Sequence, residues 1–203
     1  MATTHGPERT RKASRLHLPD SLHLTAPDSP AALFDAPKSH TASTATRIVL
    51  AATRIVVGWT FLWAFIDKVF GLGYATPSGK GWIDGGSPTA GFLGHGADGP
   101  FKGLYNDLAG TAFADWAFML GLAGIGIAMI LGIGMRIAGV SGALLYVLMW
   151  TVVLPPENNP ITDDHILGAL IVAVLALVGA GNYFGFGTWW RNTTLVKKAP
   201  WLT

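Results

Sequence analysis

The stretch WAFMLGLAGIGIAMILGIGM, residues 116–135, contains 20 residues and no charged side chain. The hydrocarbon core of a bilayer is about 30 Å thick, and roughly 20 helical residues are needed to cross it. Because lipid offers the backbone no hydrogen-bonding partner, a segment of this length must form its hydrogen bonds internally, as a helix. The stretch therefore predicts a membrane-spanning helix in an all-α protein.

Three further runs of the chain have the same character. They are residues 48–66, 137–154 and 166–184. Of all 203 residues, 13% are charged, whereas soluble domains carry about 25%. We therefore expect a bundle of four transmembrane helices over residues 47–190, in contact with the lipid bilayer. A disordered N-terminal tail, residues 1–46, is expected before the bundle, and a C-terminal tail, residues 191–203, after it.

Composition excludes several classes of site. The chain has no cysteine, so it forms no disulfide, no zinc–thiolate site and no thiol nucleophile. The pI is near 9.0, but the basic residues are dispersed, and nucleic acid is not an expected partner. We find no histidine pair typical of haem on facing helices and no flavin motif. A metal site is not expected at Asp163–His165 either, because adjacent residues of a helix point to different faces.

The distribution of Lys and Arg predicts the orientation, since positive residues are retained on the cytoplasmic side. Six basic residues precede the first run, Arg136 lies between the second and third, and three follow the fourth. The segment between the third and fourth runs, residues 155–165, carries acids and no Lys or Arg. We expect a plasma-membrane protein with four crossings and both termini in the cytoplasm. The glycine-rich segment 71–110 would then be extracytoplasmic.

Within this segment, Ser87 followed by Pro88 resembles a helix N-cap with proline at the first helical position, so a short helix is expected there. A connection this long usually has a function, and we expect it to fold over the outer mouth of the bundle or to dip into it.

Small residues predict where helices touch, because close backbone approach drives helix association in lipid. They recur at four-residue spacing in the second run (Gly124, Ala128 and Gly132) and in the third (Gly139 and Ala143). We expect these two helices to pack tightly as a hairpin, although glycine is also common in membrane helices generally.

Basic residues follow one face of the first run. Arg47, Arg54, Phe61 and Lys68 are spaced by seven residues, which drifts only about 20° per heptad. Arg54 falls inside the hydrocarbon region, where a charge costs at least about 2.5 kcal/mol. It either snorkels to headgroups or forms a structural salt bridge, or it contacts an anionic or carbonyl-bearing ligand such as a quinone. The pair Asp67–Lys68 has the ordinary interpretation of a solvated helix end.

The triplet Asp163–Asp164–His165 opens the fourth run. Acidic residues are favoured at a helix N-terminus, and Asp163 is a good capping residue. His165 has a second interpretation, because histidine titrates near neutral pH and can relay protons.

Four motifs together resemble the DoxX/DoxD-like membrane proteins, over about residues 47–202. They are WAFIDKVFGLG (63–73), GGSPTAGFL (85–93), PENNPITDDH (156–165) and GAGNYFGFGTWWR (179–191). The DoxD branch of that family resembles the membrane subunit of a thiosulfate:quinone oxidoreductase. Other members resemble membrane partners of soluble redox enzymes.

This resemblance implies a set of site residues. Those with a catalytic role would be Arg54, Asp164 and His165. Those that bind substrate would be Lys68, Gly85, Gly86, Ser87, Thr89 and Asn159. Quinone would be the electron acceptor, and thiosulfate, a dianion, would approach from the aqueous outside.

Three functions follow from these features. The first is a quinone-linked membrane oxidoreductase or its membrane subunit, with a redox or respiratory partner subunit. The second is a non-catalytic scaffold that assembles redox proteins, which the lack of any cofactor motif favours. The third is a small-solute transporter, although no inverted repeat is visible. The sequence is compatible with a homo-oligomer.

Overall fold

The computed structural model describes residues 42–159 and 161–203, and every regular element within them is helical. Three of its helices are long and apolar enough to cross a membrane. They are α1 (Thr44–Phe70), α4 (Ala112–Leu131) and α5 (Met135–Val152). A fourth apolar helix, α6 (Asp164–Leu177), has 14 residues. The predicted all-α class is confirmed, and so are helices of spanning length for three of the four expected crossings.

The first helix begins earlier than the hydropathy pattern indicates. The Ser43 hydroxyl accepts a hydrogen bond from the Thr46 amide at 3.1 Å and caps α1, which starts at Thr44. The last residues of the predicted tail, 44–46, therefore belong to the helix. Residues 1–41 of the predicted tail lie outside the described residues.

The fourth run was predicted over residues 166–184, and its predicted end is wrong. Helix α6 stops at Leu177, and Gly179 adopts a left-handed conformation with φ of 64°. This conformation is cheap for glycine and turns the chain out of the helix. Short elements follow it. They are η4 (Ala180–Asn182), α7 (Gly187–Arg191), α8 (Thr194–Lys198) and η5 (Pro200–Leu202).

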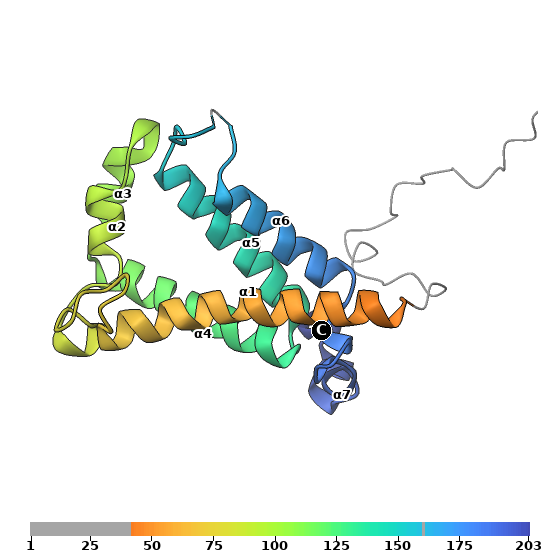
Figure 1. Ribbon diagram of the computed structural model, residues 1–203. Helices are drawn as coiled ribbons and strands as arrows, with labels where there is room; N and C mark the ends of the chain where they lie inside the picture. The colour runs from red at the N-terminus through yellow and green to blue at the C-terminus, as the bar shows by residue number, and fades with distance from the viewer. Residues whose placement is uncertain (1–41, 160) are drawn as a thin grey trace, which may run out of the picture.

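The long helices pack as two pairs, α1 with α4 and α5 with α6 (Figure 1). At Gly126 of α4, an added Cβ would lie 2.8 Å from the backbone nitrogen of Leu62 in α1. At Gly139 of α5 it would overlap the side chain of Ala176 in α6. Gly124, in contrast, faces open space. The predicted α4–α5 hairpin packs less tightly than either pair, because Gly126 and Gly139 face α1 and α6 instead.

The two pairs diverge away from the α4–α5 turn, and the segment between α1 and α4 occupies the space between their far ends (Figure 1). Its elements are η2 (Trp82–Asp84), α2 (Ala90–His95), η3 (Gly99–Phe101) and α3 (Lys102–Leu108). The Asp98 amide donates to the Val152 carbonyl at 2.9 Å and joins the segment to the end of α5. A short helix is present as expected, but it begins at Ala90 with Thr89 in the N-cap position, two residues later than the predicted cap at Ser87.

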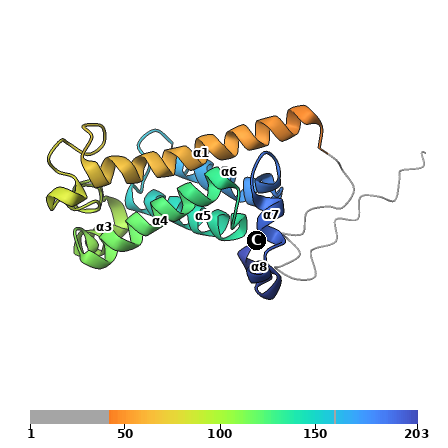
Figure 2. The same ribbon diagram turned by 90° about the horizontal axis from the view of Figure 1, so that it is seen from below.

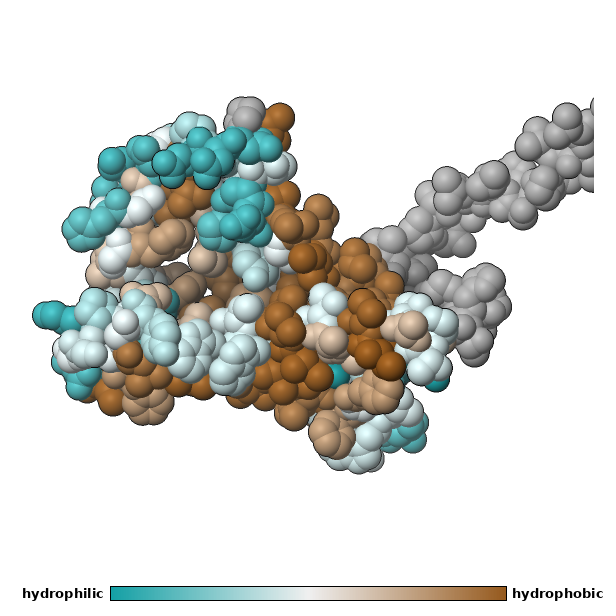
Figure 3. Space-filling view, viewed as in Figure 1, coloured by the Kyte–Doolittle hydropathy of each residue, from teal (hydrophilic) through white to brown (hydrophobic). Residues whose placement is uncertain are grey.

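The C-terminal residues pack at the opposite end of the bundle, close to the start of α5 (Figure 2). The Trp190 indole donates to the Leu202 carbonyl at 2.7 Å, and the Arg136 amide donates to the Thr203 carbonyl at 2.7 Å. Residues 191–203 therefore form ordered short helices. In Figure 3, hydrophobic residues dominate the middle of the molecule, and hydrophilic residues gather at the end that carries α3 and the α5–α6 loop.

Candidate functional site

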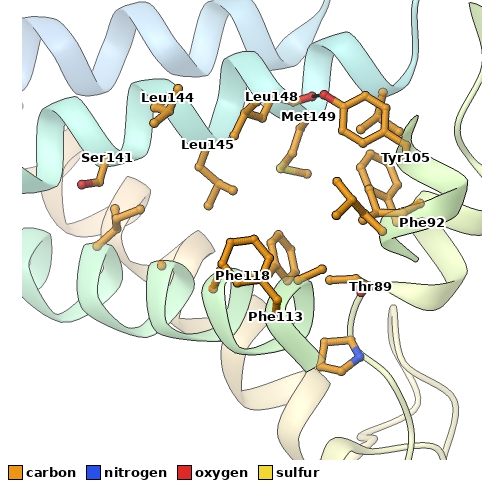
Figure 4. A pocket seen from close by; sticks show the side chains of 18 residues that line it. Thr89, Phe92, Tyr105, Phe113, Phe118, Ser141, Leu144, Leu145, Leu148 and Met149 are labelled. Atoms are coloured by element: carbon orange, nitrogen blue, oxygen red, sulfur yellow. Dashed lines mark hydrogen bonds between the residues drawn. The ribbon is translucent and has the colours of Figure 1, made fainter. Parts of the chain in front are cut away.

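A cavity of about 420 Å³ lies between α4 and α5, where the two helix pairs diverge (Figures 3 and 4). Its wall on α4 includes Phe113, Phe118 and Ile125, and its wall on α5 includes Leu144 and Leu148. These residues recur at helical spacing, so each helix presents one apolar face to the cavity. The cavity has the size and character of a site for a lipophilic small molecule.

Small side chains on α4 keep this space open. Ala114, Ala117 and Gly121 line the cavity between the bulkier residues of the same face. A Cβ added at Gly121 would meet only the Leu145 side chain, at 3.8 Å. A larger residue at Gly121 would therefore occupy the cavity without straining the backbone.

Two polar side chains, Tyr105 and Thr89, lie at the end of the cavity nearest α2 and α3, and Ser141 of α5 lies toward the other end (Figure 4). The Tyr105 hydroxyl of α3 shares a hydrogen bond with the Thr151 hydroxyl of α5 and lies 3.4 Å from the Leu148 carbonyl. An apolar body with two polar side chains at one end suits a ligand that has a hydrophobic tail and a polar head.

Asp115 of α4 holds this end together. Its carboxylate is 7% exposed, and its Oδ1 accepts from the Ser87 hydroxyl at 2.8 Å, the Thr89 amide at 3.1 Å and the Thr89 hydroxyl at 2.5 Å. The Ser87 oxygen in turn accepts from the Ala90 amide at 3.0 Å, at the start of α2. Sequence reasoning missed Asp115. The available signal was a carboxylate in the first turn of an apolar run, where the helix dipole favours it.

The two glycines predicted to bind substrate have a local backbone role. Gly85 has φ of 84° and ends η2. Gly86 donates from its amide to the Gly81 carbonyl at 3.0 Å, and a Cβ at Gly86 would overlap the Lys80 carbonyl. Together they form the turn that delivers Ser87 to Asp115.

Arg54 is 0% exposed and uses its guanidinium on backbone carbonyls. It donates to Met129 and to Ile130, the latter at 2.9 Å, near the end of α4. It also reaches the carbonyls of Tyr183 at 3.4 Å and Phe184 at 3.3 Å, in the segment after α6. The two structural interpretations from the sequence are both wrong in detail, because Arg54 does not snorkel and pairs with no acid among residues 42–159 and 161–203. It joins α1, α4 and the post-α6 segment.

The solvated interpretation of the Asp67–Lys68 pair is wrong for Asp67. This carboxylate is 1% exposed, and its Oδ2 accepts from the Thr76 amide at 2.8 Å, which fixes the loop after α1. The Lys68 ammonium lies 5.8 Å from the centroid of the Phe118 ring. Because Phe118 lines the α4–α5 cavity, Lys68 is separated from that cavity by one ring.

A second, more polar cavity of about 700 Å³ lies at the start of α6 and is lined by Asn159, Asp163, Asp164 and His165 among others. The His165 ring nitrogen Nδ1 lies 2.7 Å from Asp163 Oδ2. Asp163 Oδ1 accepts from the amides of His165 at 3.0 Å and Ile166 at 3.3 Å, so the predicted helix cap is confirmed. Burial raises the pKa of Asp163, but the His165 side chain and these amides outweigh it and hold the pKa below its ordinary value.

The remaining members of this cavity have simpler surroundings. Asn159 Oδ1 accepts from the amides of Ile161 at 3.0 Å and Thr162 at 3.2 Å and so forms a local turn. Asp164 is the first residue of α6. In the part of the chain that the structure describes, no group of three or more His, Cys, Asp or Glu side chains could hold a metal ion.

The structure thus brings the predicted residues together in separate groups. Asn159, Asp164 and His165 share the polar cavity. Thr89 lines the apolar cavity, with Lys68 beyond the Phe118 ring. Arg54 lines neither.

Compared with known proteins, the chain matches no family model, no curated protein and no solved structure. The function must therefore be argued from the cavities and the residues around them.

Proposed function

We propose that this chain is an integral membrane protein that binds a quinone between α4 and α5 and serves quinone-linked redox chemistry, alone or as the membrane subunit of a larger enzyme. The apolar cavity of about 420 Å³ carries this proposal. A quinone has an apolar tail and a ring with two carbonyl oxygens. The tail suits the leucine and phenylalanine walls, and the Tyr105 hydroxyl at the polar end would donate to a ring carbonyl in place of its hydrogen bond with Thr151.

The proposal includes four crossings, with α6 as the fourth. Fourteen helical residues rise about 21 Å, which is short of the hydrocarbon thickness. The irregular segment 178–186 completes the crossing. Non-helical backbone is tolerated at membrane depth where protein groups satisfy it, and Arg54 supplies donors to two of its carbonyls. This gives the buried charge of Arg54 a structural reason.

The orientation is part of the same proposal. The end that carries the N-terminus of α1 and the C-terminal helices has Arg47, Arg136, Arg191, Lys197 and Lys198, and no acidic residue lies within 165–203. The opposite end carries Asp84, Asp98, Asp107, Glu157, Asp163 and Asp164. By the positive-inside rule the basic end is cytoplasmic, and the two cavities open toward the outer half of the plasma membrane.

Thiosulfate oxidation and quinone reduction each involve two electrons. Two thiosulfate ions form one sulfur–sulfur bond and release two electrons, and a quinone takes up these electrons with two protons to become a quinol. Thiosulfate is the donor that the DoxD resemblance implies. His165, hydrogen-bonded to Asp163 in the polar cavity, is the side chain that would relay these protons. Because the chain has no cysteine, the electrons would reach the quinone directly or through a partner subunit.

The test compares two glycine variants of α4. Gly121→Leu places a side chain in the cavity, whereas Gly124→Leu places the same side chain in open space on the same helix. Quinone that co-purifies in mild detergent is extracted and measured by absorbance, and binding of a short-chain quinone is titrated. We expect Gly121→Leu to weaken binding by at least about tenfold, which corresponds to 1.4 kcal/mol, and Gly124→Leu to match the unsubstituted protein. Equal binding by the two variants, or none by the unsubstituted protein, would refute the site.

A scaffold without catalysis is the second candidate function, and the spatial separation of the predicted catalytic residues favours it. Arg54 is engaged by carbonyls of the protein itself and lines neither cavity. The discriminating measurement is thiosulfate-dependent quinone reduction by the purified chain. A scaffold retains a partner protein in mild detergent and shows no turnover, whether or not quinone is bound.

A further inference from the structure

A third cavity, of about 250 Å³, forms a groove between α1 and α6. It is lined by Leu50, Thr53, Leu170, Ile171, Val174 and Leu175. The Thr53 hydroxyl donates to the Val49 carbonyl within its own helix at 2.9 Å, so the groove presents no unsatisfied donor. Its chemistry is that of a hydrocarbon chain.

One end of the groove carries a positive charge. Arg47 lies one helical turn before Leu50 on α1, on the same face. Its guanidinium is 5.5 Å from the centroid of the Tyr183 ring, just after α6. The two helices run antiparallel, so α1 begins at this end of the groove and α6 finishes there. Arg47 of α1 and Tyr183, after α6, therefore lie at the same end. Arg47 is exposed there, and no ion pair to it occurs among the residues that the structure describes.

The surroundings of this end are positively charged. Neither residues 42–66 nor residues 165–203 contain an acidic side chain. The short C-terminal helices add Lys197 and Lys198, and the exposed rings of Trp189 and Trp201, 64% and 66% exposed, have the character of residues at a membrane interface. A ligand whose head is a phosphate therefore meets cations and, within residues 42–66 and 165–203, no acidic side chain.

We propose that the α1–α6 groove binds one anionic phospholipid, with an acyl chain along the groove and the phosphate at Arg47. The acyl chain gains little by leaving an equally apolar bilayer. Selectivity must therefore come from the headgroup, and the site should prefer phosphatidylglycerol to phosphatidylcholine. This site is independent of the quinone cavity, which lies between a different pair of helices.

The experiment measures lipid retention by the full chain in nanodiscs and after detergent exchange. Discs contain phosphatidylglycerol and phosphatidylcholine in equal amounts, and bound lipid is counted by native mass spectrometry. A basic residue near an anionic membrane surface contributes about 1 kcal/mol, so Arg47→Gln should lower the preference about fivefold. Lys80→Gln, at the opposite end of the molecule, is its control. Thr53→Trp should fill the groove and reduce retention of both lipids, whereas Ala52→Trp, on the exposed side of α1, should not.

Each other outcome contradicts the proposal. Equal retention of the two lipids by the unsubstituted protein removes the headgroup site. Sensitivity to Arg47→Gln but not to Thr53→Trp means that the charge binds lipid without the groove. If Thr53→Trp instead splits a dimer, the occupant of the groove is a helix of a second copy.

Discussion

Replacing Arg54 tests whether its hydrogen bonds hold α1 to the end of α4 and to the segment after α6. In Arg54→Met the side chain keeps its apolar stem and loses every donor to Met129, Ile130, Tyr183 and Phe184. Hydrogen bonds from a charged group contribute about 1.5–3 kcal/mol each. The two bonds to α4 thus contribute about 3–6 kcal/mol, and the two at 3.3 and 3.4 Å contribute little.

Part of this loss is offset, because methionine removes a charge whose burial in lipid costs about 2.5–3.5 kcal/mol. The expected net loss is about 2 kcal/mol of unfolding free energy. Arg54→Lys should be at least as damaging, since a lysine keeps the burial cost but its single ammonium cannot reach both α4 and the segment after α6.

Equilibrium unfolding in mixed detergent micelles, followed by circular dichroism, measures the change. Lys80→Met is the control, because Lys80 is an exposed basic residue outside these contacts. The reasoning fails if both Arg54 variants unfold like the unsubstituted protein. Loss of bound quinone at full stability would instead restore Arg54 as a ligand-binding residue.

Three further predictions concern other contacts. Asp115→Ala should release the segment ahead of α2 and increase hydrogen exchange at Thr89 by at least about tenfold, since a buried acceptor of three bonds is lost. Gly139→Leu should lower unfolding free energy by about 2 kcal/mol or more through overlap with Ala176, while the same change at an open position of α4 should not. The free energy of unfolding should fall with acidification below about pH 4, because the pKa of Asp163 is depressed in the folded state. The stabilisation from this carboxylate is present above its unfolded pKa and is lost as the pH drops through its folded pKa. Asp163→Asn should remove that dependence in thermal unfolding scans from pH 7 to pH 3.

The sequence predicted the apolar helices well, because length and hydropathy alone decide whether a segment can cross lipid. The end of α6 was harder. Val178, Ala180 and Phe184 keep the hydropathy high beyond Leu177, whereas the backbone turns at Gly179. Hydropathy measures side chains and carries no information on φ.

The small residues indicated close helix contacts but not the partners. Gly124 and Gly126 both belong to α4 and are two residues apart, yet only Gly126 meets α1. A regular spacing of small residues in the sequence does not tell which face of the helix meets a neighbouring helix. The partner depends on the arrangement of all four helices.

The candidate site was predictable in part. The cap at Asp163 followed from a local pattern, since capping acts within a few residues, whereas Thr89 was named only through the resemblance to the DoxX/DoxD-like proteins. The cavity between α4 and α5 did not follow from a local pattern, because it arises where two packed pairs diverge. Asp115 was missed for a related reason, as its partners are 26 and 28 residues earlier in the chain.

The unequal lengths of α1 and α6 have a consequence for the surrounding bilayer. At about 1.5 Å per residue, α1 with 27 residues measures about 40 Å and α6 with 14 residues about 21 Å. A helix longer than the hydrocarbon thickness is accommodated by tilt, so α1 should lie tilted, with its charged ends outside the hydrocarbon. Beside α6 the irregular segment 178–186 makes up the missing length, so a thicker bilayer should perturb this segment before it perturbs any long helix.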